Sequence, residues 1–341
     1  MKLNNYVALI SVRRCASTLL VILTAVLLSA CESPLVLERV VEQRQQSLQR
    51  TDLFQAATAN DNVLVTVGGY GVIVVSTDGG NNWVRQQLDS QPTLIDATTC
   101  PDGTLAALAI EGQVWVSDDN GNNWISHSLE SIEVPQSLTC DPVNRLHVVA
   151  SFSTIMMSPD HGGSWKTFSF DEDMIFTNIQ FFDTTHGLVV GEFGSMVKTF
   201  DGGQTWEMAE PMPDEFYPMA SLFLDMNTGW VAGLNGTVFH TTDGGGSWIK
   251  QDSETNAPLY RLVKSSSSIY VVGDFGTLLE YQAEEEGRWV KSAIDVGTRS
   301  YLRATRAMPD GRLLLGGGAG VLKLVGPASL NSGQKGASSN G

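Results

Sequence analysis

Five copies of one short phrase hold the most regular arrangement of reactive side chains in this sequence. Each copy has a Ser or Thr, an Asp two residues later, a Gly two residues after the Asp, and a Trp three residues after the Gly. A carboxylate at this spacing can accept hydrogen bonds from the N–H groups of a tight turn, and Gly supplies a backbone angle that other residues resist. The pattern therefore suits a repeated turn as well as a repeated site. The Asp, Gly and Trp positions are Asp78, Gly80, Trp83; Asp119, Gly121, Trp124; Asp160, Gly162, Trp165; Asp201, Gly203, Trp206; and Asp243, Gly245, Trp248.

The tryptophans of these phrases recur at a constant interval. Successive spacings are 41, 41, 41 and 42 residues, and a further step of 41 reaches Trp289. A period near 40 residues is typical of the blades of a β-propeller. Short apolar runs bounded by Gly, three in each repeat, indicate seven repeats of β-strands over residues 51–326.

The phrase resembles the Asp-box, also called the BNR repeat, whose pattern is Ser/Thr-x-Asp-x-Gly-x-x-Trp. The resemblance implies an all-β, seven-bladed β-propeller in which each box forms the turn between a blade's third and fourth strands. It does not select a function, because the box occurs in sialidases, other glycosidases, sorting receptors and assembly factors.

The ends of the repeat array differ from its middle. The sixth repeat keeps Trp289 but replaces the turn residues, and the seventh reaches Gly326-Pro327 without a fourth strand. Because an open sheet edge invites pairing with other chains, we expect Leu35–Gln43, within the segment 32–50, to supply the closing strand. The alternative is that this segment is only a linker. The tail 327–341 is rich in Ser, Gly and Asn and is expected to be disordered.

The first 31 residues have the features of a secretory signal. Lys2, Arg13 and Arg14 precede a short apolar run that ends in Leu28-Ser29-Ala30-Cys31. This ending resembles a bacterial lipobox, which implies cleavage before Cys31, lipidation of that residue, and a periplasm-facing protein anchored to a membrane. Glu32 in the next position favours the outer membrane. The alternative is an ordinary signal peptide in which Cys31 has no role.

The charge balance restricts the class of partner. Residues 1–31 contain three basic and no acidic residues, so the remaining 18 Lys and Arg face 37 Asp and Glu, a net charge of −19. Nucleic acids and anionic lipid headgroups require a basic face, so neither is expected as a partner.

No catalytic constellation emerges from the sequence. The sialidase relatives use three arginines to hold a carboxylate, and the Arg-Ile-Pro phrase that carries the first of these is absent. Acidic residues are too numerous for the sequence to exclude a glycosidase carboxylate pair. We expect no cofactor and no metal, because the histidines lack metal-ligand spacing and fall in different repeats: His127, His147, His161, His186 and His240.

A second recurring feature is the turn between the second and third strands of each repeat. In four of the seven Gly-rich turns, the residue at the tip is aromatic: Tyr70, Phe152, Phe193 and Phe275. In a propeller these turns share the face opposite the boxes. Exposed aromatic rings at this position suit a partner interface, and local packing against a neighbouring blade is the alternative.

Two further groups of residues are candidates for the same face. The long connection before the fifth repeat contains Phe216 and Tyr217 among prolines and acids, and a simple surface loop is the alternative interpretation. Basic residues gather late in the chain and could orient a partner electrostatically, with ion pairs to neighbouring carboxylates as the alternative. The members of this group are Arg261, Arg299, Arg303, Arg306 and Arg312.

Among Asp-box proteins, the sequence is similar to photosystem II stability/assembly factor-like proteins. The likeness covers the boxes, the Gly-x-x-Gly turns, the seven repeats and the lipobox. It implies a non-enzymatic assembly factor that binds a membrane subunit through an arginine-bearing patch, for which Arg261 and Arg299–Arg312 are the candidates. We therefore expect a membrane-anchored scaffold of an envelope complex, such as a transporter. The competing hypothesis is a sialidase-like or other glycan-processing or glycan-binding propeller.

Cys100 and Cys140 lie one repeat apart in matching phrases, Thr99-Cys100-Pro101-Asp102 and Thr139-Cys140-Asp141-Pro142. They could form a disulfide between neighbouring blades, or remain two buried thiols. The disulfide hypothesis predicts that thiol titration of the mature chain, unfolded without reductant, finds neither cysteine free. Two free thiols would exclude it.

Overall fold

Each repeat folds as a small sheet because its strands differ in burial. The first strands alternate buried and half-buried residues, as in β1 (Phe54–Ala59). The second strands, such as β2 (Leu64–Gly68), are buried along their whole length, since sheets cover both of their faces. The fourth strands are mostly exposed and form the outer rim, as in β4 (Val84–Gln87).

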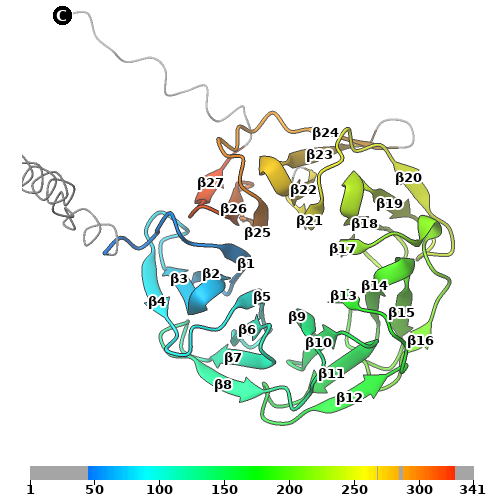
Figure 1. Ribbon diagram of the computed structural model, residues 1–341, viewed down its shortest axis with the longest axis horizontal. Helices are drawn as coiled ribbons and strands as arrows, with labels where there is room; N and C mark the ends of the chain where they lie inside the picture. Colours follow the sequence, from blue (N-terminus) through cyan, green and yellow to red (C-terminus); the bar gives the residue numbers. More distant parts are fainter. Residues whose placement is uncertain (1–44, 267, 284–286, 327–341) are drawn as a thin grey trace, which may run out of the picture. The chain divides into compact units, whose positions relative to one another are not determined.

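The computed structural model describes residues 45–266, 268–283 and 287–326, and these form seven antiparallel sheets (Figure 1). Blade 1 is β1, β2, β3 (Val72–Ser76) and β4; blade 2 is β5 (Leu94–Thr99), β6 (Leu105–Ala109), β7 (Gln113–Ser117) and β8 (Ile125–Ser128); blade 3 is β9 (Pro135–Cys140), β10 (Leu146–Ala150), β11 (Thr154–Ser158) and β12 (Lys166–Ser169); blade 4 is β13 (Phe176–Phe181), β14 (Gly187–Gly191), β15 (Met196–Thr199) and β16 (Glu207–Met208); blade 5 is β17 (Pro218–Phe223), β18 (Gly229–Gly233), β19 (Val238–Thr241) and β20 (Ile249–Gln251); blade 6 is β21 (Leu259–Lys264), β22 (Ile269–Gly273), β23 (Leu278–Gln282) and β24 (Arg288–Lys291); blade 7 is β25 (Leu302–Ala307), β26 (Leu313–Gly317) and β27 (Leu322–Val325).

The blades are arranged in a ring with the first strands innermost (Figure 1). The apolar core lies between neighbouring sheets. One cluster, for example, joins Phe54 and Leu64 of blade 1 to Leu314 of blade 7. The predicted all-β, seven-bladed propeller is confirmed.

Blade 7 has three strands within the described residues. The predicted closing strand, Leu35–Gln43, lies outside those residues, as do the signal segment, Cys31 and the tail 327–341. The first residues that the structure describes contact blade 7. Leu48 packs in the cluster shared by blades 1 and 7, and the Gly320 N–H donates to the Asp52 carbonyl at 2.9 Å.

The box residues form the turn between third and fourth strands, as the resemblance implies. In the fifth copy, the Thr241 hydroxyl and the Ser247 N–H both donate to Asp243 Oδ1 at 2.8 Å, and the Gly245 N–H donates to Thr241 Oγ1 at 2.8 Å. Hydrogen bonds from the side chain and backbone of Ser247 and from Thr241 lower the pKa of Asp243 to about 2. The carboxylates of the boxes therefore stabilise turns.

The sixth blade keeps its tryptophan in another arrangement. Trp289 is fully buried, and its Nε1 donates to Gln251 Oε1 at 3.0 Å, as does Trp230 Nε1 at 3.1 Å. The indole thus remains part of the core between blades 5 and 6.

A disulfide joins Cys100, which follows β5, to Cys140 at the end of β9, with the two Cα atoms 5.1 Å apart. It links blades 2 and 3, the arrangement that the disulfide hypothesis requires.

Blade 3 contains a buried ionisable group. His147 is fully buried, and its Nε2 lies 3.1 Å from Asp141 Oδ2. Burial lowers the pKa of His147 against the opposing effect of Asp141. Burial alone would raise the pKa of Asp141, but hydrogen bonds from His147 and Arg145 outweigh it and hold the pKa at about 2.

Lowering the pH from 7 should reduce the free energy of unfolding. The native pKa of His147 lies below its ordinary 6.5, so just below pH 6.5 the unfolded chain binds more protons than the folded one. The contribution is at most about 1.4 kcal/mol per pH unit. In urea unfolding between pH 7 and 5, the free energy of unfolding should fall less steeply with decreasing pH for His147→Gln than for the parent protein. His186→Gln, on the surface, is the control. If the free energy of unfolding changes equally with pH in all three proteins, His147 is not the source of the pH dependence.

Candidate functional site

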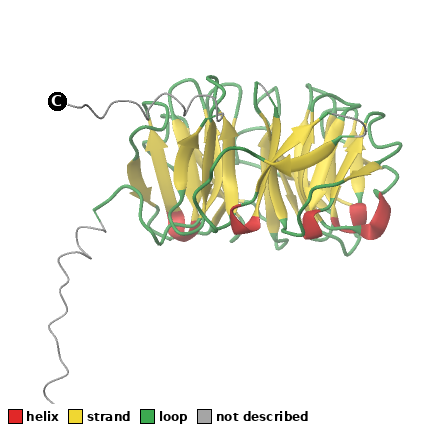
Figure 2. Cartoon of the chain, turned by 90° about the horizontal axis from the view of Figure 1, so that it is seen from above, coloured by secondary structure: helices red, strands yellow, loops and turns green. Residues whose placement is uncertain are grey.

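The turns between second and third strands place one residue in the left-handed region. Four of these turns are short 3₁₀ segments, η2 (Gly69–Gly71), η3 (Glu192–Gly194), η5 (Leu234–Gly236) and η6 (Asp274–Gly276). They lie on one face of the ring, where Figure 2 shows them in red. The closing Gly is required in this geometry: Gly236 has φ +66, and a Cβ there would collide with the Thr255 carbonyl.

The four predicted aromatic residues occupy the tips of second-to-third-strand turns: three lie in η2, η3 and η6, and Phe152 lies in the turn between β10 and β11. Tyr70, Phe152, Phe193 and Phe275 have φ of 59, 55, 58 and 54° and are 62, 44, 58 and 71% exposed. Asn235 and Ala319 occupy the same position in blades 5 and 7, also at positive φ. The turn therefore does not require an aromatic side chain. We call these four residues and their turns the turn face.

A polar funnel opens in the middle of the ring, among the starts of the first strands. This cavity of about 170 Å³ is lined by residues of all seven blades. Its polar lining includes Gln55, Asp96, Ser137, Asn178, Tyr217, Tyr260, Arg261 and Arg303.

An ion pair crosses this funnel between blades that are not neighbours. Arg261 Nη2 of blade 6 lies 2.8 Å from Asp96 Oδ1 of blade 2. Asp96 is buried, and its Oδ2 accepts the Ser137 hydroxyl at 2.8 Å and the Leu138 N–H at 3.0 Å.

Arg303 lies beside this pair and, within the part of the chain that the structure describes, forms no ion pair with a carboxylate. Its Nη1 donates to Gln55 Oε1 at 3.1 Å, and its guanidinium lies 4.7 Å from the centre of the Tyr260 ring. Burial, and then the charge of Arg261, lower the pKa of Arg303. The funnel thus holds a cation paired mainly with neutral groups.

The other members of the predicted basic group are dispersed. Arg299 is exposed and lines a groove of about 1030 Å³ on blade 6 together with Phe275. Arg306 lies toward the box face and donates to the Ala59 carbonyl at 3.4 Å, while Arg312 pairs with Asp310 at 2.7 Å. Positions 303 and 306 separate because they lie toward opposite ends of β25, which crosses the ring from face to face.

The prediction that Phe216 is a partner-binding residue is wrong. Its ring is buried against Phe239, with centroids 5.0 Å apart, and it belongs to the core between blades 4 and 5. The proline-rich connection folds this side chain inward. Tyr217, the next residue, lines the funnel, and burial raises its pKa.

Four polar residues of the funnel were not predicted from the sequence: Gln55, Asp96, Ser137 and Tyr260. A signal was available, because Gln55, Asp96, Ser137 and Arg261 each precede a repeat tryptophan by 28 residues. The same step that located the blades also locates this ring of side chains.

Comparison with protein families matches residues 158–314 to the family described as photosynthesis system II assembly factor YCF48. This stretch runs from the third box into the seventh blade. The predicted resemblance to this family is confirmed. A search of curated proteins gives no match.

Solved structures of the same fold include proteins of different function. YCF48 from Cyanidioschyzon merolae has a TM-score of 0.66 at 14% identity, covering 82% of this chain and 96% of that one. A structure described as YCF48 bound to D1 peptide has a TM-score of 0.65 at 15% identity, covering 82 and 93%. Virginiamycin B lyase from Staphylococcus aureus has a TM-score of 0.68 at 10% identity, covering 82 and 97%. At these identities the likeness shows the fold alone.

Removal of the cross-funnel cation should destabilise the ring. Arg261→Met leaves Asp96 buried without its cation and is expected to cost about 3 kcal/mol in the free energy of unfolding. Adding Asp96→Asn should recover part of this loss. The matched control is Lys250→Met, which breaks an exposed pair with Asp214 and should cost under about 1 kcal/mol. Equal costs for the two single variants in urea unfolding would contradict a structural role for the Arg261 pair.

Proposed function

We propose, with the family match as the premise, that this protein is a non-enzymatic scaffold that binds a protein subunit of an envelope membrane complex through its turn face. A transporter is one such complex. The observation that carries the proposal is the exposure of the four aromatic rings at positions where the fold accepts Asn or Ala.

Exposed rings on one face are expensive to leave in water and are favoured in interface centres. Among the described residues, none of the four rings stacks on another aromatic ring. Each is also held at a fixed backbone angle by its turn, so little conformational entropy is lost when a partner covers it.

The charges on this face add orientation to the contact. Arg299 lies with Phe275 in the groove on blade 6, and Arg303 offers a guanidinium in the funnel. In a protein with net charge −16, these cations favour a partner segment that carries a local acid next to apolar side chains.

A lipid on Cys31 would hold the scaffold at a membrane, with the periplasm-facing, outer-membrane location as the expected one. This part of the proposal rests on the lipobox-like ending of residues 28–31. Within the described residues, no helix is long and apolar enough to span a bilayer.

The test is a crosslinked pull-down from envelope extracts with the double variant Phe193→Ala plus Phe275→Ala. Ala is tolerated in this turn geometry, as Ala319 shows, so the fold should persist. We expect the variant to lose one specific membrane protein by about 10-fold or more, as hot-spot residues would require.

Phe200→Ala is the matched control. Phe200 is 52% exposed but lies in a box turn on the opposite face, so its removal should leave the partner bound. Equal recovery of the partner by all three proteins would refute the turn face as the interface. Hydrolysis of sialosides or β-glucans by the pure protein would replace the proposal with the glycan-processing alternative.

A further inference from the structure

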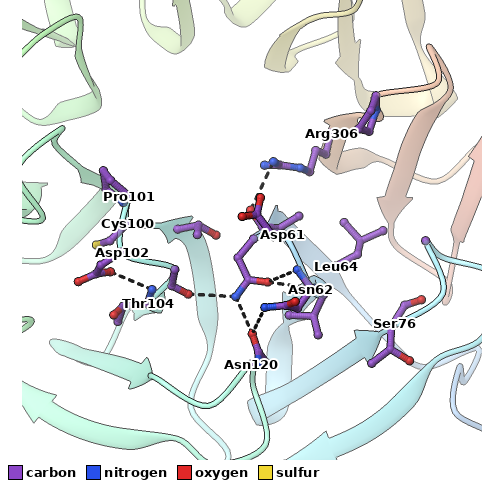
Figure 3. Close-up of a pocket in the computed structure, with 18 of the residues that line it drawn as sticks. Asp61, Asn62, Leu64, Ser76, Cys100, Pro101, Asp102, Thr104, Asn120 and Arg306 are labelled. Atoms are coloured by element: carbon purple, nitrogen blue, oxygen red, sulfur yellow. Dashed lines mark hydrogen bonds between the residues drawn. The ribbon is translucent and has the colours of Figure 1, made fainter.

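Three potential metal ligands converge on the box face, away from the turn face, and a fourth, Cys140, is bonded to one of them. Ligand atoms of Cys100, Asp102 and His161 all lie within 4.8 Å of one another, and Cys140 is bonded to Cys100. Cys100 and Asp102 line a cavity of about 980 Å³ on this face, and Figure 3 shows them side by side at its edge.

His161 is an unusual residue type for its position in the box. It occupies the residue after the box Asp, at φ 54, where the other copies have Gly79, Asn120, Gly202 and Gly244. Since L-residues seldom adopt this angle and Gly adopts it freely, the turn itself gives no reason for an imidazole.

The imidazole and the carboxylate face each other at ion-pair distance, in an orientation that does not make a hydrogen bond. His161 Nε2 is buried and lacks a hydrogen-bond partner among the described residues, although it lies 3.1 Å from Asp102 Oδ2. The other oxygen, Asp102 Oδ1, accepts the Thr104 N–H at 2.9 Å, which fixes the carboxylate. Two ligands of a tetrahedral Zn²⁺ at bond lengths near 2.0–2.1 Å stand about 3.3 Å apart, close to this separation.

We propose that the reduced protein binds one Zn²⁺ through the thiolates of Cys100 and Cys140, His161 Nε2 and the Asp102 carboxylate. The set combines two soft sulfur ligands, one imidazole and one carboxylate, a donor set suited to four-coordinate zinc. The site ties β5 and β9 to the third box turn, and therefore spans blades 2 and 3.

Reduction of the Cys100–Cys140 disulfide requires a reductant, for which a dithiol is suited. The dithiol transfers two electrons and two protons to the S–S bond, which breaks to give two thiols, and the dithiol is oxidised to its own disulfide. Zn²⁺ then displaces the two thiol protons as it binds. The disulfide and the zinc complex exclude each other, because each uses both sulfur atoms.

The test measures Zn²⁺ binding by the purified full chain before and after reduction with an excess of a phosphine, using competition with a chromophoric chelator. We expect one tightly bound Zn²⁺ in the reduced protein and none in the oxidised protein. Co²⁺ in place of Zn²⁺ should give the thiolate charge-transfer and tetrahedral d–d absorption bands. Reduced protein that binds Zn²⁺ no better than oxidised protein would overturn the proposal.

His161→Asn is the informative variant, because Asn120 already occupies the equivalent box position. It should keep the melting temperature of the oxidised protein and weaken Zn²⁺ binding by at least about 100-fold. Cys100→Ser with Cys140→Ser should abolish binding, which also separates this site from Cys15 and Cys31.

His186→Asn is the matched control, since His186 pairs with Asp183 on the surface at 2.8 Å and has no cysteine in its phrase. It should bind Zn²⁺ like the parent. Retention of full Zn²⁺ affinity by His161→Asn, or by the double serine variant, would show that zinc binds elsewhere and would refute the site.

Discussion

The ring depends on the hydrogen bonds that each box carboxylate accepts in the turn before the fourth strand. A four-stranded blade must reverse direction at its outer edge, and the N–H groups of that tight turn need acceptors. Asp243 and its equivalents supply them, and the hydroxyl two residues earlier completes the bonding. Where the sixth blade loses the box, Trp289 is held instead by Gln251 of blade 5. The outer edge is thus fixed locally in five blades and by a neighbour in the sixth.

The fold could be predicted because its information is periodic. The tryptophan spacing located six blades, the apolar runs located the seventh, and the Gly-rich turns located the exposed aromatic residues, since a turn that requires positive φ directs its tip residue outward. The arginines were harder to place. Arg303 and Arg306 are close in sequence but emerge toward opposite faces, a separation that depends on how the strand crosses the ring. Phe216 went inward because core packing outweighed the polar character of its connection.

The two faces of the ring differ in the chemistry that they can offer. The turn face presents aromatic rings fixed by backbone geometry, together with Arg299 and the funnel cation. The box face presents carboxylates, amides, a disulfide and an imidazole around its cavity. The first set suits contact with another protein surface, and the second suits small polar species. Neither set could have been assigned to a face from composition alone, because both come from the same repeats.

The ion pair between Arg261 and Asp96 has a consequence for how the molecule comes apart. In an open array of repeats, each unit touches only its neighbours, so stability is a sum of local terms and ends can fray. Here blade 6 is bonded directly to blade 2 across the axis. Melting of blade 6 would leave the buried Asp96 of blade 2 without its cation, which couples distant parts of the ring in unfolding. A contact across the axis, added to the contacts between neighbouring blades, therefore opposes unfolding one blade at a time.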